Sequence, residues 1–229
     1  LAYNCSTTFY DNIVRGNATN HRSYAGLYLY GYGNVRITGG NLVLADNTVG
    51  GVGGAYGGAY VYATYNSTID LPNSRITGNY APGNFGGAYF YAYDHSTIRV
   101  PNLYVYDNEA GDKYGGVGLD AADGNDRIIA TGAQVINNTA RLDGGGGLAY
   151  ASDGSRVDLT GSEFVSNTAG NYGGGVYVQS IVNGASLLLA DTAFLTNTAG
   201  NDGGGVYFSH GPNYGSFLDL SGSRFISNT

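Results

Sequence analysis

A repeat of about 30 residues runs along most of the chain and constrains its fold more than any other feature. The strings GSEFVSNTAGNYGGGVYV, from Gly161, and DTAFLTNTAGNDGGGVYF, from Asp191, match at most positions with an offset of 30. An apolar residue followed three positions later by asparagine recurs throughout, beginning with the pair Phe9 and Asn12. The later asparagines of this pattern are Asn47, Asn79, Asn108, Asn138, Asn167, Asn197 and Asn228. Repeats of this length are typical of solenoids and propellers.

Each repeat contains three short apolar segments. One follows the asparagine motif and begins with two glycines, as in Gly174-Gly175-Val176-Tyr177. Another precedes it, as in Val157-Asp158-Leu159. Such segments alternate inward and outward residues but are too short to be stable alone, so they must stack on their counterparts in neighbouring repeats. The sequence therefore predicts an all-β fold, a single-chain parallel β-helix (β-solenoid) with three short strands per coil of about 30 residues and about seven to eight coils.

The repeat covers residues 1–229 as one β-helix, with less regular first coils over 1–50 and regular repeats over 51–229. The printed sequence stops in mid-repeat at Phe225-Ile226-Ser227-Asn228-Thr229. Because terminal coils of a solenoid expose unpaired backbone and core, we expect either a piece of a longer solenoid or a subunit that stacks end to end into a filament.

The repeated polar and glycine positions predict corner structures. The recurring asparagines from Asn47 to Asn228 are expected to form a ladder of side-chain amides, each bonded to the asparagine of the adjacent coil. The double glycines are expected at a second corner, where the backbone has a positive φ or no room for a Cβ atom.

Composition excludes several other classes. With 13% aromatic and 42% hydrophobic residues, the chain is too apolar for a disordered segment. Its 40 glycines do not fall at every third position, as collagen requires, and they disfavour a helical bundle. A net charge of −7 argues against a nucleic-acid partner, and no apolar run is long enough for a transmembrane segment. The single cysteine, Cys5, excludes an intrachain disulfide.

The two motifs together resemble a known repeat. Gly86-Gly87-Ala88-Tyr89 and Gly174-Gly175-Val176-Tyr177 carry the first motif, and Phe164-Val165-Ser166-Asn167 and Phe194-Leu195-Thr196-Asn197 carry the second. This combination is similar to the repeats of the chlamydial polymorphic outer-membrane proteins and related autotransporter passengers. The resemblance spans nearly the whole chain and implies a parallel β-helix with a structural or adhesive role outside the cell or on its surface. The coils between residues 44 and 138 depart from it by replacing Phe with Leu, Ile or Val.

Tyrosine is the residue that a bare solenoid does not need. If Ala88, Phe90 and Ala92 point inward, the tyrosines between them point outward and form a broad face. The column of outward tyrosines from successive coils is expected to be interrupted at Gly118 and Ala149. Such a face is a candidate for packing against copies of the chain or for binding extracellular glycans. Its predicted members are Tyr28, Tyr30, Tyr60, Tyr62, Tyr89, Tyr91, Tyr93, Tyr177 and Tyr207.

An enzyme of the polysaccharide lyase or hydrolase type is an alternative, because such enzymes share this architecture. Its catalysis requires clustered carboxylates, and the densest group here is Asp120, Asp123 and Asp126, which is also a weak candidate for calcium binding. A solvated turn is the favoured interpretation of this group. The three histidines, His21, His95 and His210, fall at different phases of the repeat and are not expected to share a metal. No cofactor is expected.

Two further patterns remain open. A column of threonines suggests ice binding as another alternative, although Tyr80 and Glu109 interrupt it; its members are Thr48, Thr139, Thr168, Thr198 and Thr229. Sequons for N-glycosylation occur at Asn4, Asn17, Asn66 and Asn137. The sequence favours a non-enzymatic, extracellular or cell-surface solenoid with a structural or adhesive role, whose partners are copies of itself and, alternatively, glycans.

Overall fold

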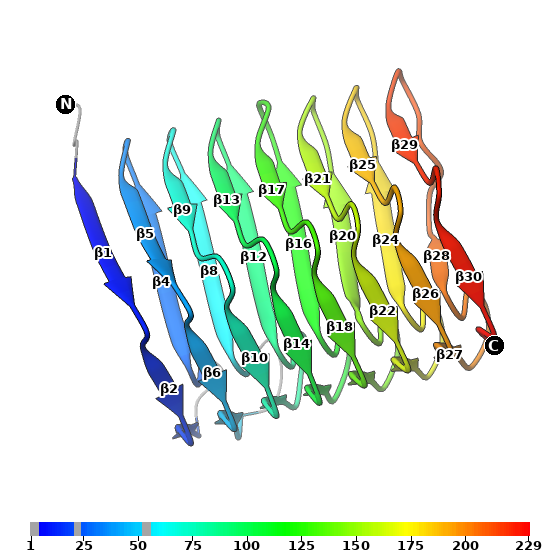
Figure 1. The fold of residues 1–229 in the computed structure, drawn as a ribbon, viewed down its shortest axis with the longest axis horizontal. Coiled ribbons are helices and arrows are strands. Elements are labelled where there is room, and N and C mark those ends of the chain that lie inside the picture. The colour runs from blue at the N-terminus through cyan, green and yellow to red at the C-terminus, as the bar shows by residue number, and fades with distance from the viewer. Residues whose placement is uncertain (1–4, 21–23, 52–55) are drawn as a thin grey trace.

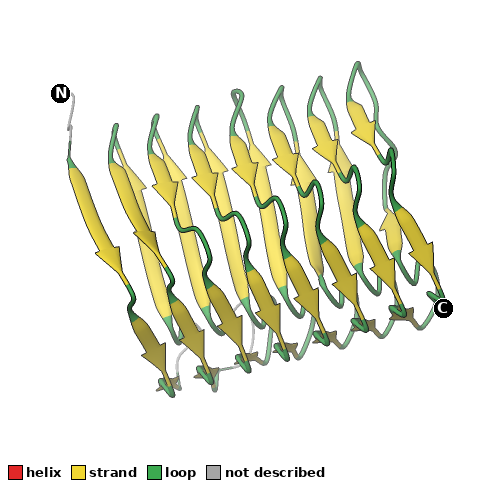
Figure 2. Cartoon of the chain, viewed as in Figure 1, coloured by secondary structure: helices red, strands yellow, loops and turns green. Residues whose placement is uncertain are grey.

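The chain folds into a parallel β-solenoid in which each coil lies directly on the one before it (Figure 1). A computed structural model describes residues 5–20, 24–51 and 56–229. Every regular element among these residues is a β-strand, and turns connect them (Figure 2). Equivalent positions in successive coils are 29 to 32 residues apart along the asparagine ladder described below. The predicted all-β solenoid with coils of about 30 residues is confirmed.

Each coil contributes one strand to each of four parallel sheets. Sheet A contains β1 (Ser6–Tyr10), β5 (Arg36–Gly40), β9 (Thr68–Asp70), β13 (Thr97–Arg99), β17 (Arg127–Ile129), β21 (Arg156–Asp158), β25 (Ser186–Leu188) and β29 (Phe217–Asp219). Sheet B contains β2 (Ile13–Arg15), β6 (Val43–Ala45), β10 (Arg75–Thr77), β14 (Tyr104–Tyr106), β18 (Gln134–Ile136), β22 (Glu163–Val165), β26 (Ala193–Leu195) and β30 (Arg224–Ile226).

The other two sheets complete the coil. Sheet C contains the two-residue strands β3 (Ala18–Thr19), β7 (Thr48–Val49), β11 (Tyr80–Ala81), β15 (Glu109–Ala110), β19 (Thr139–Ala140), β23 (Thr168–Ala169) and β27 (Thr198–Ala199). Sheet D contains β4 (Leu27–Tyr32), β8 (Ala59–Thr64), β12 (Ala88–Tyr93), β16 (Val117–Ala122), β20 (Gly147–Ala151), β24 (Val176–Ile181) and β28 (Val206–Phe208). Sheet C adds a short fourth strand to the three that the sequence predicts.

Sheets A and B form one side of the solenoid, and sheet D lies behind them (Figure 1). Between them runs a continuous apolar core made largely of inward residues of sheets A, B and D, whereas Val49 and Ala81 of sheet C form a separate small cluster. Phe164 and Phe194 stack in the continuous core with centroids 5.2 Å apart, and Phe194 and Phe225 stack at 4.9 Å. The phenylalanines of successive coils therefore stack on one another in a single column, as close packing in a repeat requires.

The double glycines lie where the chain enters sheet D. A Cβ atom on Gly87 would lie 2.2 Å from the carbonyl oxygen of Gly116 and 3.1 Å from Cγ of Asn108. Close approach of neighbouring backbones, rather than a positive φ, therefore explains these glycines. Gly57 and Gly58 belong to the same column although they come three residues late in the sequence, since Gly58 donates to the carbonyl of Gly87 at 2.7 Å.

Candidate functional site

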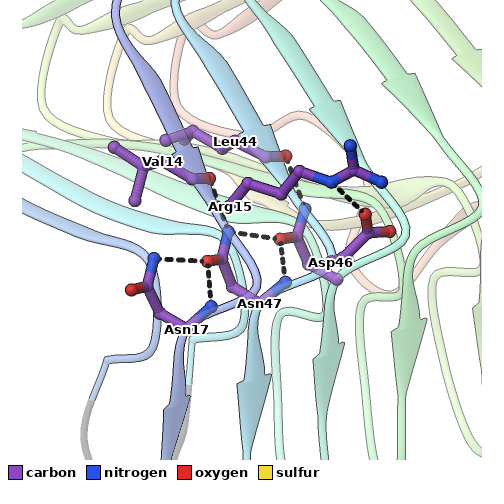
Figure 3. A network of polar contacts seen from close by, with 7 residues as sticks. Val14, Arg15, Asn17, Leu44, Asp46 and Asn47 are labelled. Atoms are coloured by element: carbon purple, nitrogen blue, oxygen red, sulfur yellow. Dashed lines mark hydrogen bonds and ion pairs between the residues drawn. The ribbon is translucent and has the colours of Figure 1, made fainter.

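The asparagine ladder forms the corner between sheets B and C (Figure 3). Asn47 Nδ2 donates to Asn79 Oδ1 at 2.9 Å and to the carbonyl of Val14 at 3.1 Å, while its main-chain N–H also donates to Asn79 Oδ1. The same pattern repeats from coil to coil, so each amide fixes three neighbouring coils. The rungs are Asn17, Asn47, Asn79, Asn108, Asn138, Asn167, Asn197 and Asn228.

The first rung differs from the sequence prediction. Asn17, which lies 30 residues before Asn47, occupies it, whereas Asn12 is exposed and donates to the carbonyl of Tyr10. Phe9, the apolar partner assigned to Asn12, lies on β1 and pairs with Gly39 in sheet A. The apolar-x-x-Asn motif occurs twice in this segment, and the 35-residue spacing from Asn12 to Asn47 is too long for one coil.

The residue before each rung has a left-handed conformation, because the chain turns there from sheet B into sheet C. Asp46, for example, has a φ of 54°. Glycine, asparagine and aspartate adopt this conformation most readily, which explains most of the column. The members of this column are Gly16, Asp46, Gly78, Asp107, Asn137, Ser166, Thr196 and Ser227.

A second polar ladder lies at the corner between sheets D and A. The main-chain N–H of Ser67 donates to Ser96 Oγ at 3.1 Å, that of Ser96 to Asp126 Oδ1 at 2.7 Å, and that of Asp126 to Ser155 Oγ at 3.0 Å. Asp126 is fully buried, and burial raises the pKa of its carboxyl to about 7. Sequence reasoning missed this ladder because its side chains vary from coil to coil.

The tyrosine face is the outer surface of sheet D, formed by two rows of outward side chains. Alternation along β12 is as predicted, with Ala88, Phe90 and Ala92 buried and the tyrosines between them outside. The first row contains Tyr28, Tyr60, Tyr89, Gly118, Leu148, Tyr177 and Tyr207. The second contains Tyr30, Tyr62, Tyr91, Asp120 and Tyr150, and Tyr93 follows at the end of β12. Leu148 occupies the position assigned to Ala149, whose side chain is buried in the core.

The rings of the tyrosine face cover one another. Tyr62 and Tyr91 stack with centroids 4.9 Å apart at an angle of 19°, and Tyr60 and Tyr89 at 5.6 Å and 19°. Since these separations are close to the strand spacing, most ring faces contact the next ring and the edges and hydroxyls face solvent. At the first coil, Tyr30 is 44% exposed. The surface is therefore a ribbed array of ring edges and hydroxyl groups.

A second aromatic column flanks the first row at the turn before the double glycines. Phe85 and Tyr114 are 7% and 8% exposed and lie 5.0 Å apart, and they form an apolar cluster with Leu148. A Cβ atom on Gly118 would lie 2.3 Å from Cε1 of Phe85. Gly118 is therefore no gap in the face, because the neighbouring rings fill the space above it.

Asp120 is a carboxylate set among the tyrosines. Tyr89 donates its hydroxyl proton to Asp120 Oδ2 at 2.5 Å, and the other oxygen, Oδ1, is buried without a hydrogen-bond partner among the described residues. Burial raises the pKa of Asp120 to about 6, with the Tyr89 hydrogen bond acting in the opposite direction. Burial and the nearby Asp120 raise the pKa of Tyr91 to about 12. The sequence singled out Asp120 only as a member of an acidic group, considered for polysaccharide catalysis and for calcium binding.

The three predicted calcium ligands have separate partners. Asp120 accepts from Tyr89, Asp126 accepts from the main chain of Ser96, and Asp123 lies near Tyr93 and raises the pKa of its hydroxyl. In the described part of the chain, no group of three or more His, Cys, Asp or Glu side chains is arranged to hold a metal ion. His95 and His210 are exposed, and His21 lies outside the described residues.

The other predicted positions are on the surface. Thr48, Thr139, Thr168 and Thr198 form a single exposed column on sheet C, with Tyr80 and Glu109 in register between the first two. The sequon residues Asn66 and Asn137 are exposed. Asn137 donates to Asp107, Asn17 belongs to the ladder, and Asn4 lies outside the described residues.

These features define a parallel β-solenoid with a tyrosine-rich face, the class to which the chain belongs. No helix in the described segments is long and apolar enough to cross a membrane. Comparisons with known proteins find no matching family model, no matching curated protein and no matching solved structure.

Proposed function

We propose that the protein is a non-enzymatic structural solenoid that acts outside the cell or on its surface, and that its tyrosine face is an adhesive surface for a second copy of the chain. The observation that carries this proposal is the stacking of the tyrosine rows. Their ring faces are already covered, so a sugar ring has little face to stack on, whereas ring edges and hydroxyls suit contact with another ribbed surface. The extracellular assignment is supported by the resemblance of the repeat motifs to surface-protein repeats.

A second copy is the favoured partner because the face repeats with the strand spacing. A surface with ribs about 4.8 Å apart matches the ribs of an identical surface over many coils at once. Exposed Tyr28 and Tyr30 mark the part of the face with the most uncovered area. The burial of partly apolar rings supplies the free energy of such a contact.

Sedimentation velocity over a range of concentrations tests this proposal. We expect the protein to self-associate and the double variant Tyr30→Ser/Tyr62→Ser to remain monomeric. Tyr214→Ser is the matched control, because Tyr214 is 83% exposed and lies outside the tyrosine face. A wild-type protein that stays monomeric at all concentrations, or a control that dissociates equally, would refute the proposal. Release of products from a panel of polysaccharides would refute the non-enzymatic assignment.

End-to-end assembly into filaments is a second candidate. Phe225 and Ile226 on the last coil are 51% and 50% exposed, and the first coil has an apolar recess of about 240 Å³ beside Phe9 and Val14. A second copy or further coils of the same chain would cover both surfaces. Electron microscopy distinguishes axial filaments from short rods, and Phe225→Ser should shorten filaments without affecting a lateral contact made by the tyrosine face.

A further inference from the structure

The outer face of sheet B contains an open groove of about 560 Å³ that is unrelated to the tyrosine face. Its floor consists of small outward residues, Val43, Ala45 and Thr77, on β6 and β10. Larger side chains on β2 and β14 rise on either side, among them Arg15 and Tyr106. The groove exists because the small Ala45 and Thr77 lie between the long Arg15 and Tyr106 at one register position of sheet B.

The groove offers an aromatic ring face of the kind that the tyrosine face lacks. Arg75 lies over the ring of Tyr104, with Cζ 4.5 Å from the centroid. Tyr104 and Tyr106 point to the same side of β14, and their ring planes differ by 25°. Since Thr77 pairs with Tyr106 as Arg75 pairs with Tyr104, Tyr106 turns the corresponding face toward the small Thr77. A sugar ring can therefore stack on Tyr106.

The charges of the groove leave one cation available. Arg15 Nε bonds Asp46 Oδ2 at 2.8 Å (Figure 3), and Asp107 accepts from the side-chain amide of Asn137. Arg75 is exposed, and none of the ion pairs found in the described part of the chain involves it. A guanidinium held flat on an aromatic ring keeps its edge free for a carboxylate.

The groove continues along the solenoid axis beyond Arg75. A second recess of about 320 Å³ shares Arg75 and Tyr104 with the first and is lined by the amides of Asn73, Asn102 and Gln134. Amide groups donate and accept hydrogen bonds and so suit sugar hydroxyls. From β2 to β18 the two recesses span four strand spacings, or about 19 Å, which fits an extended chain of several sugars.

We infer that this groove binds a linear oligosaccharide in which neutral sugars alternate with an acidic sugar, with a sugar ring on Tyr106 and a carboxylate on Arg75. A sparse negative charge fits better than a dense one, because the chain has a net charge of −7 and Arg75 is the one unpaired cation among the described residues that line the groove. The site goes beyond the proposed function, since it lies on sheet B and does not involve the tyrosine face.

Isothermal titration calorimetry with two hexasaccharides tests the inference. Hyaluronan hexasaccharide alternates glucuronate with N-acetylglucosamine, and chitohexaose contains N-acetylglucosamine alone. We expect the acidic chain to bind about fivefold more tightly than the neutral one, because an exposed ion pair contributes up to about 1 kcal/mol. Its affinity should fall with added salt, as expected for an exposed charge pair.

Three variants assign the binding to the groove. Arg75→Gln should remove the preference for the acidic chain, while Arg224→Gln, an exposed arginine at the same register position on β30, should preserve it. Thr77→Phe should abolish binding of both chains, because a ring beside Tyr106 would cover the stacking face without changing any charge. Unfolding curves that match the wild type show that each variant is folded.

Several outcomes overturn the inference. Equal affinity for the two hexasaccharides, no binding of either, or equal effects of Arg75→Gln and Arg224→Gln would each do so. Tighter binding of a glutamate-containing hexapeptide than of hyaluronan hexasaccharide would assign the groove to a protein partner instead. Loss of oligosaccharide binding in Tyr30→Ser/Tyr62→Ser would place the site on the tyrosine face. Because sedimentation reports on that face and calorimetry on the groove, either proposal can fail alone.

Discussion

Asn108 donates two hydrogen bonds to one oxygen of Asn138: its main-chain nitrogen lies 3.0 Å from Asn138 Oδ1 and its Nδ2 lies 2.9 Å away. Asn138 is completely buried and donates in turn to Asn167. Each rung thus satisfies polar groups that no water molecule reaches, so the ladder is a requirement of the fold as much as a stabilising device.

Removal of one rung should therefore be costly. Asn138→Ala leaves two buried donors of Asn108 without an acceptor, and we expect the free energy of unfolding to fall by about 3 kcal/mol. Chemical denaturation measures this change. Asn12→Ala is the control, since Asn12 is exposed, lies outside the ladder and donates to the carbonyl of Tyr10. Equal losses for both variants would contradict the role of burial.

The double-glycine column predicts a steric effect. A Cβ atom on Gly116 would lie 2.3 Å from the carbonyl oxygen of Gly146, so Gly116→Ala should destabilise the protein by about 3 kcal/mol through backbone displacement. Gly211→Ala provides the comparison, because no atom of the described residues lies within 4 Å of its Cβ position. Thermal unfolding of the two variants should show a lower midpoint for Gly116→Ala alone.

The inner phenylalanine stack predicts a cavity effect. Phe194 is fully buried between Phe164 and Phe225, and Phe194→Ala should reduce the free energy of unfolding by about 4 kcal/mol. Phe225→Ala should cost about 1 to 2 kcal/mol, because half of that side chain is already exposed. Urea denaturation measures both changes. Equal reductions in the free energy of unfolding for the two variants would argue against a continuously packed phenylalanine column.

Asp120 predicts a dependence of stability on pH. Its carboxyl has a pKa of about 6 in the folded chain against an ordinary value of 3.8, so the folded state binds its proton more tightly than the unfolded state. Its contribution is most favourable below about pH 4 and is lost as the pH rises to about 6, at a cost of roughly 3 kcal/mol. Asp126, with a pKa of about 7, acts in the same direction.

Asp120→Asn removes the ionisable group and keeps an acceptor for Tyr89. The variant should be more stable than the wild type at pH 8 and should lose much of the decline in stability between pH 4 and 6. Urea denaturation across this range measures the effect, and Glu109→Gln, at an exposed position on sheet C, is the control. A variant less stable than the wild type at pH 8 would show that the carboxylate is needed.

The sequence predicted the fold because the fold is a repeat. Residues such as Asn138 and Gly116 recur with the period of the coil, and a conserved spacing within one chain identifies both the stacking direction and the corners. The first rung was misassigned because Phe9 and Asn12 satisfy the motif by coincidence, and strand pairing, together with the 30-residue spacing from Asn17 to Asn47, identifies Val14 and Asn17 instead.

The candidate sites were less predictable because they depend on differences between coils. The groove arises where Ala45 and Thr77 lie beside Tyr106, which no period reveals. The environment of Asp120 depends on how the rings around it tilt, as does the filling of the space above Gly118. Periodicity specifies which residues stack, whereas side-chain packing decides what they leave exposed.

The side-chain amide dipoles of the asparagine ladder all point the same way along the solenoid axis. Every described rung donates from Nδ2 to the Oδ1 of the following coil, so the amide dipoles add along the axis and polarise one another. A coil placed before Asn17 must therefore present a donor, and one placed after Asn228 must present an acceptor. Two solenoids meeting head to head would oppose like groups, so the corner itself admits growth of the rod in one polarity only.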